Sequence, residues 1–208
     1  MERDVVPTIG VLALQGAFRE HGTILVGLGA AVREVRLPTE LEGLDGLVIP
    51  GGESTTMGKL MEAFGLIEPL RAFARETPVF GTCAGLIMLA KRTTEGDQPL
   101  LGLLDITVRR NAFGRQVHSF EAPVDVRLPD LTGAETVPGV FIRAPWVEEV
   151  GEGVEPVAWC DGRVVGVRRD HLLGLAFHPE LTDDARFHAY FIRLVAGHRP
   201  AELAAVGA

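Results

Sequence analysis

A cysteine bracketed by glycines is the residue in this sequence best suited to nucleophilic chemistry. Cys83 lies in Gly81-Thr-Cys83-Ala-Gly85, directly after the apolar residues 78–80. The pattern is typical of a nucleophile elbow, in which a strand turns sharply into a helix, with cysteine in place of serine. Glycines suit such a turn because side chains there would clash, and the helix N-terminus favours the attacking thiolate. A buried structural cysteine is the alternative.

A second motif supplies a base and its orienting acid. His178 and Glu180 stand in Phe177-His-Pro-Glu180, which follows the apolar run of residues 172–177 at a predicted strand end. In extended backbone, side chains two residues apart point to the same side, so the carboxylate can hold the imidazole in one tautomer. Cys83, His178 and Glu180 therefore fit the roles of nucleophile, base and orienting acid.

The remaining histidines are not expected to take part in this chemistry. His188, in a predicted helix over residues 187–195, is interpreted as a helix-surface residue. The others lack an acid at the spacing of His178 and Glu180; they are His21, His118, His171 and His198. One histidine thus stands out as the base.

A glycine pair could stabilise the negative charge that develops during attack on a carbonyl. Gly51 and Gly52 follow an apolar strand, and Ser54-Thr-Thr56 predicts a hydroxyl-capped helix through about residue 64. One backbone N–H of the pair and that of Ala84, after the nucleophile, would form an oxyanion hole. A plain glycine turn between strand and helix is the alternative.

The same segment does not fit a phosphate-binding loop. The Walker pattern requires four residues between a glycine and Gly-Lys, followed by Ser or Thr. Here five residues separate Gly52 from Gly58, and Leu60 follows Lys59. We therefore discount nucleotide binding.

Composition limits the class of protein. The chain has 208 residues, 47% hydrophobic, and a formal charge of −8, which predicts one domain over residues 1–208. No apolar run nears the roughly 20 residues of a spanning helix, and no leader is evident, so we expect a cytoplasmic protein without membrane contact. Basic residues form no run longer than two, with pairs at 91–92, 109–110 and 168–169, which argues against nucleic-acid binding. Cys83 and Cys160, the latter expected in the core at a strand end, do not suit a metal.

Periodicity predicts an α/β fold. Strands and helices alternate as far as about residue 91, with strands at 9–14, 32–36, 46–49 and 79–80 and helices at 17–28, 54–64, 69–75 and after the elbow. This alternation predicts a mostly parallel sheet flanked by helices on both faces, with active groups at the carboxyl ends of strands. Residues 103–177 alternate with a period near two, which predicts an added antiparallel or mixed strand region. A helix over 187–195 closes the chain.

The ordered set of motifs resembles the class I (triad) glutamine amidotransferases, whose fold is flavodoxin-like, and more narrowly the glutaminase subunit of pyridoxal phosphate synthase. The resemblance extends over nearly the whole chain. It is carried by Ile9-Gly-Val-Leu-Ala-Leu-Gln-Gly16 with Arg19-Glu-His21, Pro50-Gly-Gly-Glu-Ser-Thr-Thr56, the elbow, Arg110-Asn-Ala-Phe-Gly-Arg-Gln116, Val140-Phe-Ile-Arg-Ala-Pro145 and Phe177-His-Pro-Glu-Leu181.

The resemblance implies hydrolysis of L-glutamine to glutamate and ammonia, with no cofactor. It also implies that the partner is a barrel-shaped synthase subunit, in an assembly of twelve synthase and up to twelve glutaminase chains, docked through residues 15–21 and 110–116. Residues implied to line the glutamine site or oxyanion hole are Gly51, Gly52, Glu53, Ala84, Arg110, Ile142 and Arg143. An arginine suits the substrate's α-carboxylate, because its guanidinium group can donate two N–H bonds to the two carboxylate oxygens. Arg110 or Arg143 could instead be a solvated surface charge.

Three alternatives stay open. The chain could be a glutaminase subunit of another amidotransferase pathway, or a thiol hydrolase of another amide or ester, because an elbow does not define a substrate. It could also be a noncatalytic binding module of the same fold. Ammonia release from glutamine, with and without a synthase, separates these interpretations.

Overall fold

The computed structural model describes residues 6–112, 119–128, 131 and 136–198. Its first half alternates strands and helices: β1 (Thr8–Leu12), α1 (Phe18–Gly27), β2 (Ala31–Val35), η1 (Pro38–Leu41), β3 (Gly46–Ile49), α2 (Ser54–Ala63), α3 (Ile67–Phe73), β4 (Val79–Thr82) and α4 (Ala84–Leu89). The second half is mainly strands: β5 (Ala90–Thr93), β6 (Leu104–Arg109), β7 (Phe120–Val126), β8 (Thr136–Phe141), β9 (Trp146–Val150), β10 (Glu155–Cys160), β11 (Arg163–Arg169) and β12 (Leu172–Leu175), followed by η2 (Pro179–Leu181) and α5 (Arg186–Gly197).

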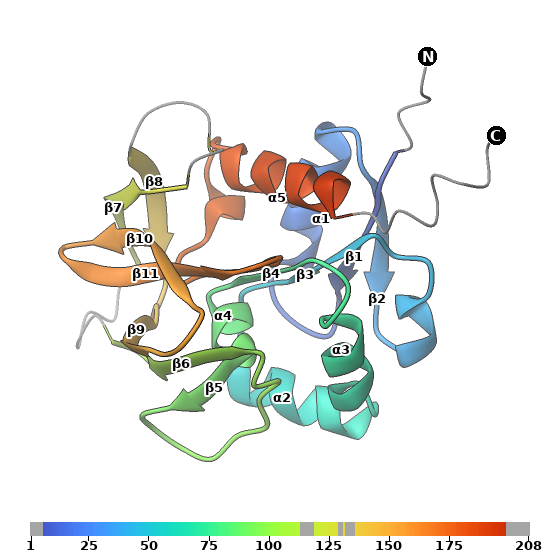
Figure 1. The fold of residues 1–208 in the computed structure, drawn as a ribbon, viewed down its shortest axis with the longest axis horizontal. Coiled ribbons are helices and arrows are strands. Elements are labelled where there is room, and N and C mark those ends of the chain that lie inside the picture. Colours follow the sequence, from blue (N-terminus) through green and yellow to red (C-terminus); the bar gives the residue numbers. More distant parts are fainter. Residues whose placement is uncertain (1–5, 113–118, 129–130, 132–135, 199–208) are drawn as a thin grey trace.

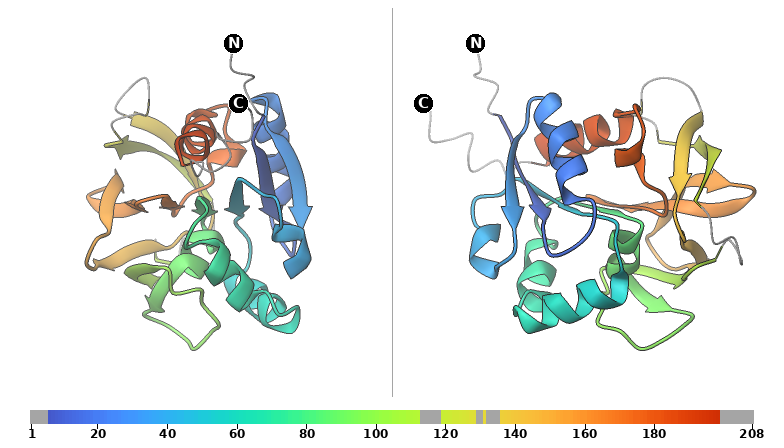
Figure 2. Two further views of the ribbon diagram at one scale, coloured as in Figure 1. Left: turned by 45° about the vertical axis from the view of Figure 1, so that its right-hand side comes forward. Right: turned by 180° about the vertical axis from the view of Figure 1, so that it is seen from behind.

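Five parallel strands form the centre of the sheet, in the order β2-β1-β3-β4-β12. This is the flavodoxin-like order. Every residue of β3, β4 and β12 is buried, as expected for parallel strands covered on both faces. Helices α1 and α5 lie on one face and α2, α3 and α4 on the other (Figures 1 and 2). The predicted α/β fold is confirmed.

The sheet continues beyond β12 through strands that pair antiparallel, except that β5 pairs in parallel with β6. Strands β11, β10, β7 and β8 follow in order, and β9 connects β11 to β6 and β5. They form the left-hand part of Figure 1. The predicted antiparallel or mixed strand region is thus confirmed, and its last strand, β12, is where the two kinds of pairing meet, since it pairs antiparallel with β11 and parallel with β4. Its uninterrupted apolar sequence, Leu172-Leu-Gly-Leu175, is typical of a strand buried on both faces.

Helix α2 has a different cap from the one predicted. The N-cap is Glu53, whose carboxylate accepts hydrogen bonds from the backbone N–H groups of Thr55 and Thr56. Ser54 is buried inside the helix. A carboxylate can cap as a hydroxyl does, and its charge also complements the helix dipole.

The interpretation of His188 as a helix-surface residue is wrong. His188 is fully buried, on the stripe of α5 that also carries Phe191 and Val195. His21 is fully buried as well, in α1, and therefore does not belong to an exposed docking face. The other end of the expected docking face, residues 113–116, lies outside the described residues, as does His118.

In the described part of the chain, no helix is long and apolar enough to cross a bilayer.

The close approach of α4 to β3 gives a stability prediction. A Cβ atom on Gly85 would stand 2.0 Å from the Ile49 carbonyl oxygen, a backbone atom that cannot move alone. We expect Gly85→Ala to lower the free energy of unfolding by about 1–3 kcal/mol in urea titrations, as overpacking does. The matched control is Gly27→Ala, since a Cβ there meets nothing, and it should be neutral or stabilising. Equal stability of the two variants would contradict this account of the packing.

Candidate active site

The elbow at Cys83 has the strained geometry that its sequence predicts. Cys83 has φ 48° and ψ −100°, between β4 and α4, and its N–H donates to the Leu175 carbonyl 2.8 Å away. A Cβ on Gly81 would meet the Gly85 backbone at 2.7 Å, which shows why glycine flanks the turn. Residues in such a sparsely populated backbone region are retained mainly at functional sites.

His178 and Glu180 reach the elbow from the chain that follows β12. Leu175 pairs with Thr82, so the residues after β12 leave the sheet beside the residues after β4. His178 Nδ1 lies 2.7 Å from Glu180 Oε1, and the Glu180 side chain is fully buried. The backbone differs from the prediction: Glu180 is part of η2, not of an extended segment. The tight turn at Pro179 brings the two side chains together instead.

The histidine and the cysteine are strongly coupled. Burial alone would lower the pKa of His178, but hydrogen bonds to Cys83 and Glu180 and their negative charges outweigh burial and raise this pKa to about 10. At neutral pH the ring is therefore a protonated imidazolium beside Cys83. This pair can deliver a nucleophile and a proton to the same substrate.

A hollow of about 700 Å³ lies over the pair. Of the predicted substrate-binding residues, those that line it are Gly52, Glu53, Arg110, Ile142 and Arg143, together with Cys83 and His178. A hollow of about 860 Å³ elsewhere, between β8 and the start of α5, contains none of the three proposed catalytic residues and is more open. The hollow that contains Cys83 is therefore the candidate substrate site.

Sequence reasoning missed four lining residues, namely Ser54, Ile87, Asn111 and Ser119. Ile87 lies one helical turn after Cys83, so helical spacing could have indicated it. Asn111 follows Arg110 directly. Ser119 comes from a distant segment and carries no local signal.

Of the predicted oxyanion residues, Gly52 lines the hollow, whereas Gly51 and Ala84 lie behind its lining. Ala84 is buried, and as the first residue of α4 its N–H has no acceptor within the helix. A Cβ on Gly51 would meet His178 Cε1 at 2.3 Å and Cys83 Cβ at 3.3 Å, so Gly51 packs directly against both. Its carbonyl accepts from the Ala17 N–H at 3.3 Å.

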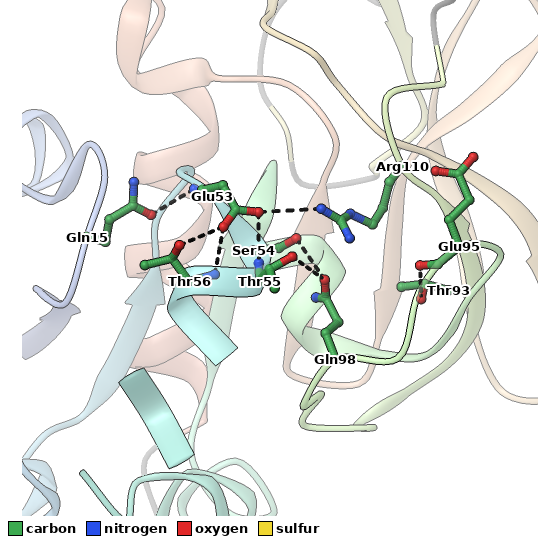
Figure 3. Close-up of polar contacts among 9 residues, drawn as sticks. All are labelled: Gln15, Glu53, Ser54, Thr55, Thr56, Thr93, Glu95, Gln98 and Arg110. Carbon is green, nitrogen blue, oxygen red and sulfur yellow. Dashed lines mark hydrogen bonds and ion pairs between the residues drawn. The ribbon is translucent and has the colours of Figure 1, made fainter. Parts of the chain in front are cut away.

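Glu53 and Arg110 form a polar wall of the hollow (Figure 3). Glu53 Oε1 lies 3.4 Å from an Arg110 guanidinium nitrogen, and Gln15 accepts from the Glu53 N–H at 2.7 Å. Partial burial would raise the pKa of Glu53, but hydrogen bonds from the Thr56 hydroxyl and the Thr56 and Thr55 N–H groups lower it to about 2. Glu53 is therefore a fixed negative charge. Among the described residues, no cluster of side chains is suited to a metal ion.

Comparison with known proteins decides the family. Residues 11–197 match the SNO glutamine amidotransferase family. The chain belongs to this family. Similar relatives include the pyridoxal 5'-phosphate synthase subunit PdxT of Herpetosiphon aurantiacus, 56% identical over 90% of this chain and 100% of the relative. The PdxT subunit of Streptomyces avermitilis is 54% identical over 94% and 98% of the two chains.

Solved structures agree with this family. A crystal structure of a glutamine amidotransferase aligns with a TM-score of 0.84 and 49% identity, over 90% of this chain and 98% of that chain. A putative GMP synthase component from Thermoplasma acidophilum aligns with a TM-score of 0.71 and 18% identity, over 97% and 100%. The second likeness concerns the fold alone. The resemblance found in the motifs is thus confirmed.

The coupling between Cys83 and His178 is measurable. In Cys83→Ala the hydrogen bond and the electrostatic interaction with Cys83 that raise the pKa of His178 are lost while burial remains, so this pKa should fall from about 10. NMR titration of the ring nitrogens checks this, and at about pH 8 the ring should change from protonated to mostly neutral. Cys160→Ala is the control, since Cys160 is buried at the end of β10. An unchanged titration in Cys83→Ala would contradict this coupling.

Proposed function

We propose that this chain hydrolyses L-glutamine to glutamate and ammonia, as the cytoplasmic glutaminase subunit of pyridoxal 5'-phosphate synthase. The observation that carries the proposal is the Cys83 elbow joined to His178 and Glu180 at the base of a polar hollow. Relatives named as PdxT subunits, at 56% and 54% identity, support the choice of pathway.

The proposed reaction has two steps, in which His178 first donates a proton and then accepts one. The Cys83 thiolate attacks the side-chain amide carbon of glutamine, forming a carbon–sulfur bond. His178 donates its proton to the departing nitrogen, so the carbon–nitrogen bond breaks and ammonia leaves. A water molecule then gives a proton to His178 and adds to the thioester carbon. The carbon–sulfur bond breaks, which releases glutamate and restores the thiolate with an imidazolium.

Backbone donors would stabilise the tetrahedral intermediate. The N–H of Ala84 is one donor, and one N–H of the Gly51-Gly52 pair is the other. Each such donor typically lowers the barrier by about 2.7–4 kcal/mol. The orientation of the glycine loop therefore matters greatly for rate.

The wall of the hollow would hold the amino-acid end of glutamine. Arg110 and Arg143 offer guanidinium groups to the α-carboxylate, and Glu53, a carboxylate that stays ionised, offers a charge to the α-ammonium. Ile142 lines the hollow with an exposed apolar side chain, and its carbonyl oxygen lies 3.9 Å from Cys83 Sγ. No cofactor is required for these steps.

Ammonia protonates readily in water, so its release is useful only beside an acceptor enzyme. The proposed acceptor is the synthase subunit, in an assembly of twelve synthase and up to twelve glutaminase chains. Coupling through the glycine loop is supported by contacts of the segment at residues 15–17. Gln15 accepts from the Glu53 N–H, and the Ala17 N–H donates to the Gly51 carbonyl. A partner that moves this segment would rotate the loop peptide and change its N–H direction.

Removal of the thiol tests the nucleophile. Cys83→Ala should abolish ammonia release from glutamine while it leaves the fold and docking to the synthase intact, because alanine fits the same space. The glutamine-like electrophile 6-diazo-5-oxo-norleucine should attach to Cys83, as mass spectrometry of the labelled peptide will show. Cys160→Ala is the control and should keep full activity and labelling. Retained turnover in Cys83→Ala, or labelling at Cys160, would contradict the assignment of Cys83 as the nucleophile.

Dependence on the partner tests the coupling. The isolated chain should release ammonia slowly, and saturating synthase should raise the steady-state rate, because docking selects the loop orientation that completes the oxyanion hole. Glutamate formation is measured before and after synthase is added, with Cys83→Ala as the blank. Equal rates would remove the coupling and leave the catalytic assignment unaffected.

A further inference from the structure

Glu180 has a second buried neighbour besides His178. Its Oε1 lies 2.7 Å from His178 Nδ1, whereas its Oε2 lies 3.4 Å from His21 Nε2, with both side chains fully buried. That second contact is too poorly aligned to count as a hydrogen bond, and Oε2 has no other partner among the described residues. A buried carboxylate oxygen needs a donor nearby, because an uncompensated charge is costly.

His21 is itself held by two polar contacts. Its Nε2 lies 3.0 Å from the Thr82 hydroxyl, in the strand that leads to the elbow, and its Nδ1 lies 2.8 Å from His188 Nε2. The ring of Phe80 packs edge-on against both imidazoles, with centroids 6.2 Å and 5.8 Å away. Residues from α1, β4, η2 and α5 thus meet at one buried point.

Both of these imidazoles are neutral at physiological pH. Burial, followed by the proximity of His188 and His178, lowers the pKa of His21 well below its usual range. Burial lowers the pKa of His188 to about 4. Each ring therefore carries one N–H, and the ring nitrogen that holds it decides what Glu180 faces.

Only one arrangement of the two protons suits the contacts. If His21 carries its proton on Nδ1, its Nε2 lone pair faces the Glu180 carboxylate, and the remaining proton of His188 must sit on Nδ1, which is buried without a partner among the residues that the structure describes. If both rings carry the proton on Nε2, His188 donates to His21 Nδ1, and the protonated His21 Nε2 has the Thr82 hydroxyl at 3.0 Å and Glu180 Oε2 at 3.4 Å. The second arrangement leaves the lone pair of His188 Nδ1, and not an N–H group, without a partner. A buried N–H group without an acceptor costs more than a buried lone pair without a donor.

We propose that His21, held by His188 in its Nε2–H tautomer, is a positioning residue that orients the Glu180 carboxylate toward His178. His21 touches neither glutamine nor Cys83 and acts only through Glu180. The inference rests on the proposed glutaminase function for its kinetic readout, but the tautomer is a property of the chain alone.

Two amide substitutions at His21 separate orientation from packing. Glutamine places its amide nitrogen near the position of Nε2, whereas asparagine places its own near Nδ1, too short to approach Glu180. With saturating synthase, we expect kcat of His21→Asn to lie about 10- to 100-fold below that of His21→Gln, because only glutamine keeps an N–H beside the Glu180 charge. KM for glutamine should agree within about threefold, since the contact acts on chemistry and not on binding. Both variants should lose a similar amount of thermal stability. A purely structural role would also produce this loss, so the difference in kcat is the deciding measurement.

The tautomer is tested directly by long-range proton–nitrogen NMR of the imidazoles in the intact chain. We expect His21 and His188 protonated at Nε2, with His198→Gln, at the end of α5, as a control that leaves both signals in place. Protonation of His21 at Nδ1, or equal kcat for the two amide variants, would overturn the proposal. If the wild-type complex releases no ammonia, the proposed function fails while the NMR result still decides the tautomer.

Discussion

The close approach of three backbone segments around Cys83 is the constraint on which the rest of the site depends. Strand β3, the end of β4 and the start of α4 meet where Gly85 carries no side chain against the Ile49 carbonyl. Gly51 in turn leaves room for His178 Cε1, which a Cβ would approach to 2.3 Å. Side chains at these glycines would push Cys83, His178 and the loop at Gly51 apart. Backbone contact, rather than side-chain packing, therefore sets the geometry of the reacting groups.

Electrostatics within this frame divides the histidines into two kinds. His178 is buried but faces Cys83 and Glu180, so its pKa rises to about 10 and it carries a proton. His21 and His188 are buried without a carboxylate in hydrogen-bonding geometry, so their pKa values fall and they stay neutral. One carboxylate thus lies between a charged ring and a neutral one. The protonation state of each ring follows from its neighbours, not from its residue type.

Several features could be read from local sequence because their causes are local. The glycines around Cys83 indicate a sharp turn, and the uninterrupted apolar sequences of β3 and β4 indicate strands buried on both faces. The spacing of His178 and Glu180 indicates their contact, although a turn of η2 achieves it instead of an extended strand. The burial of His188 was also readable in principle, since it lies three residues before Phe191 and seven before Val195 on one stripe of α5.

The sequence by itself determined the elbow, the alternating fold and the order of the motifs that mark the family, because these depend on residues close together in the chain. Only the tertiary structure decided that β12 lies beside β4 and carries His178 to Cys83. It also decided that His21 meets His188 across 167 positions of sequence, beside Glu180. Such contacts arise from the packing of α1 and α5 on the same face of the sheet, and no local pattern records which side chains that packing brings together.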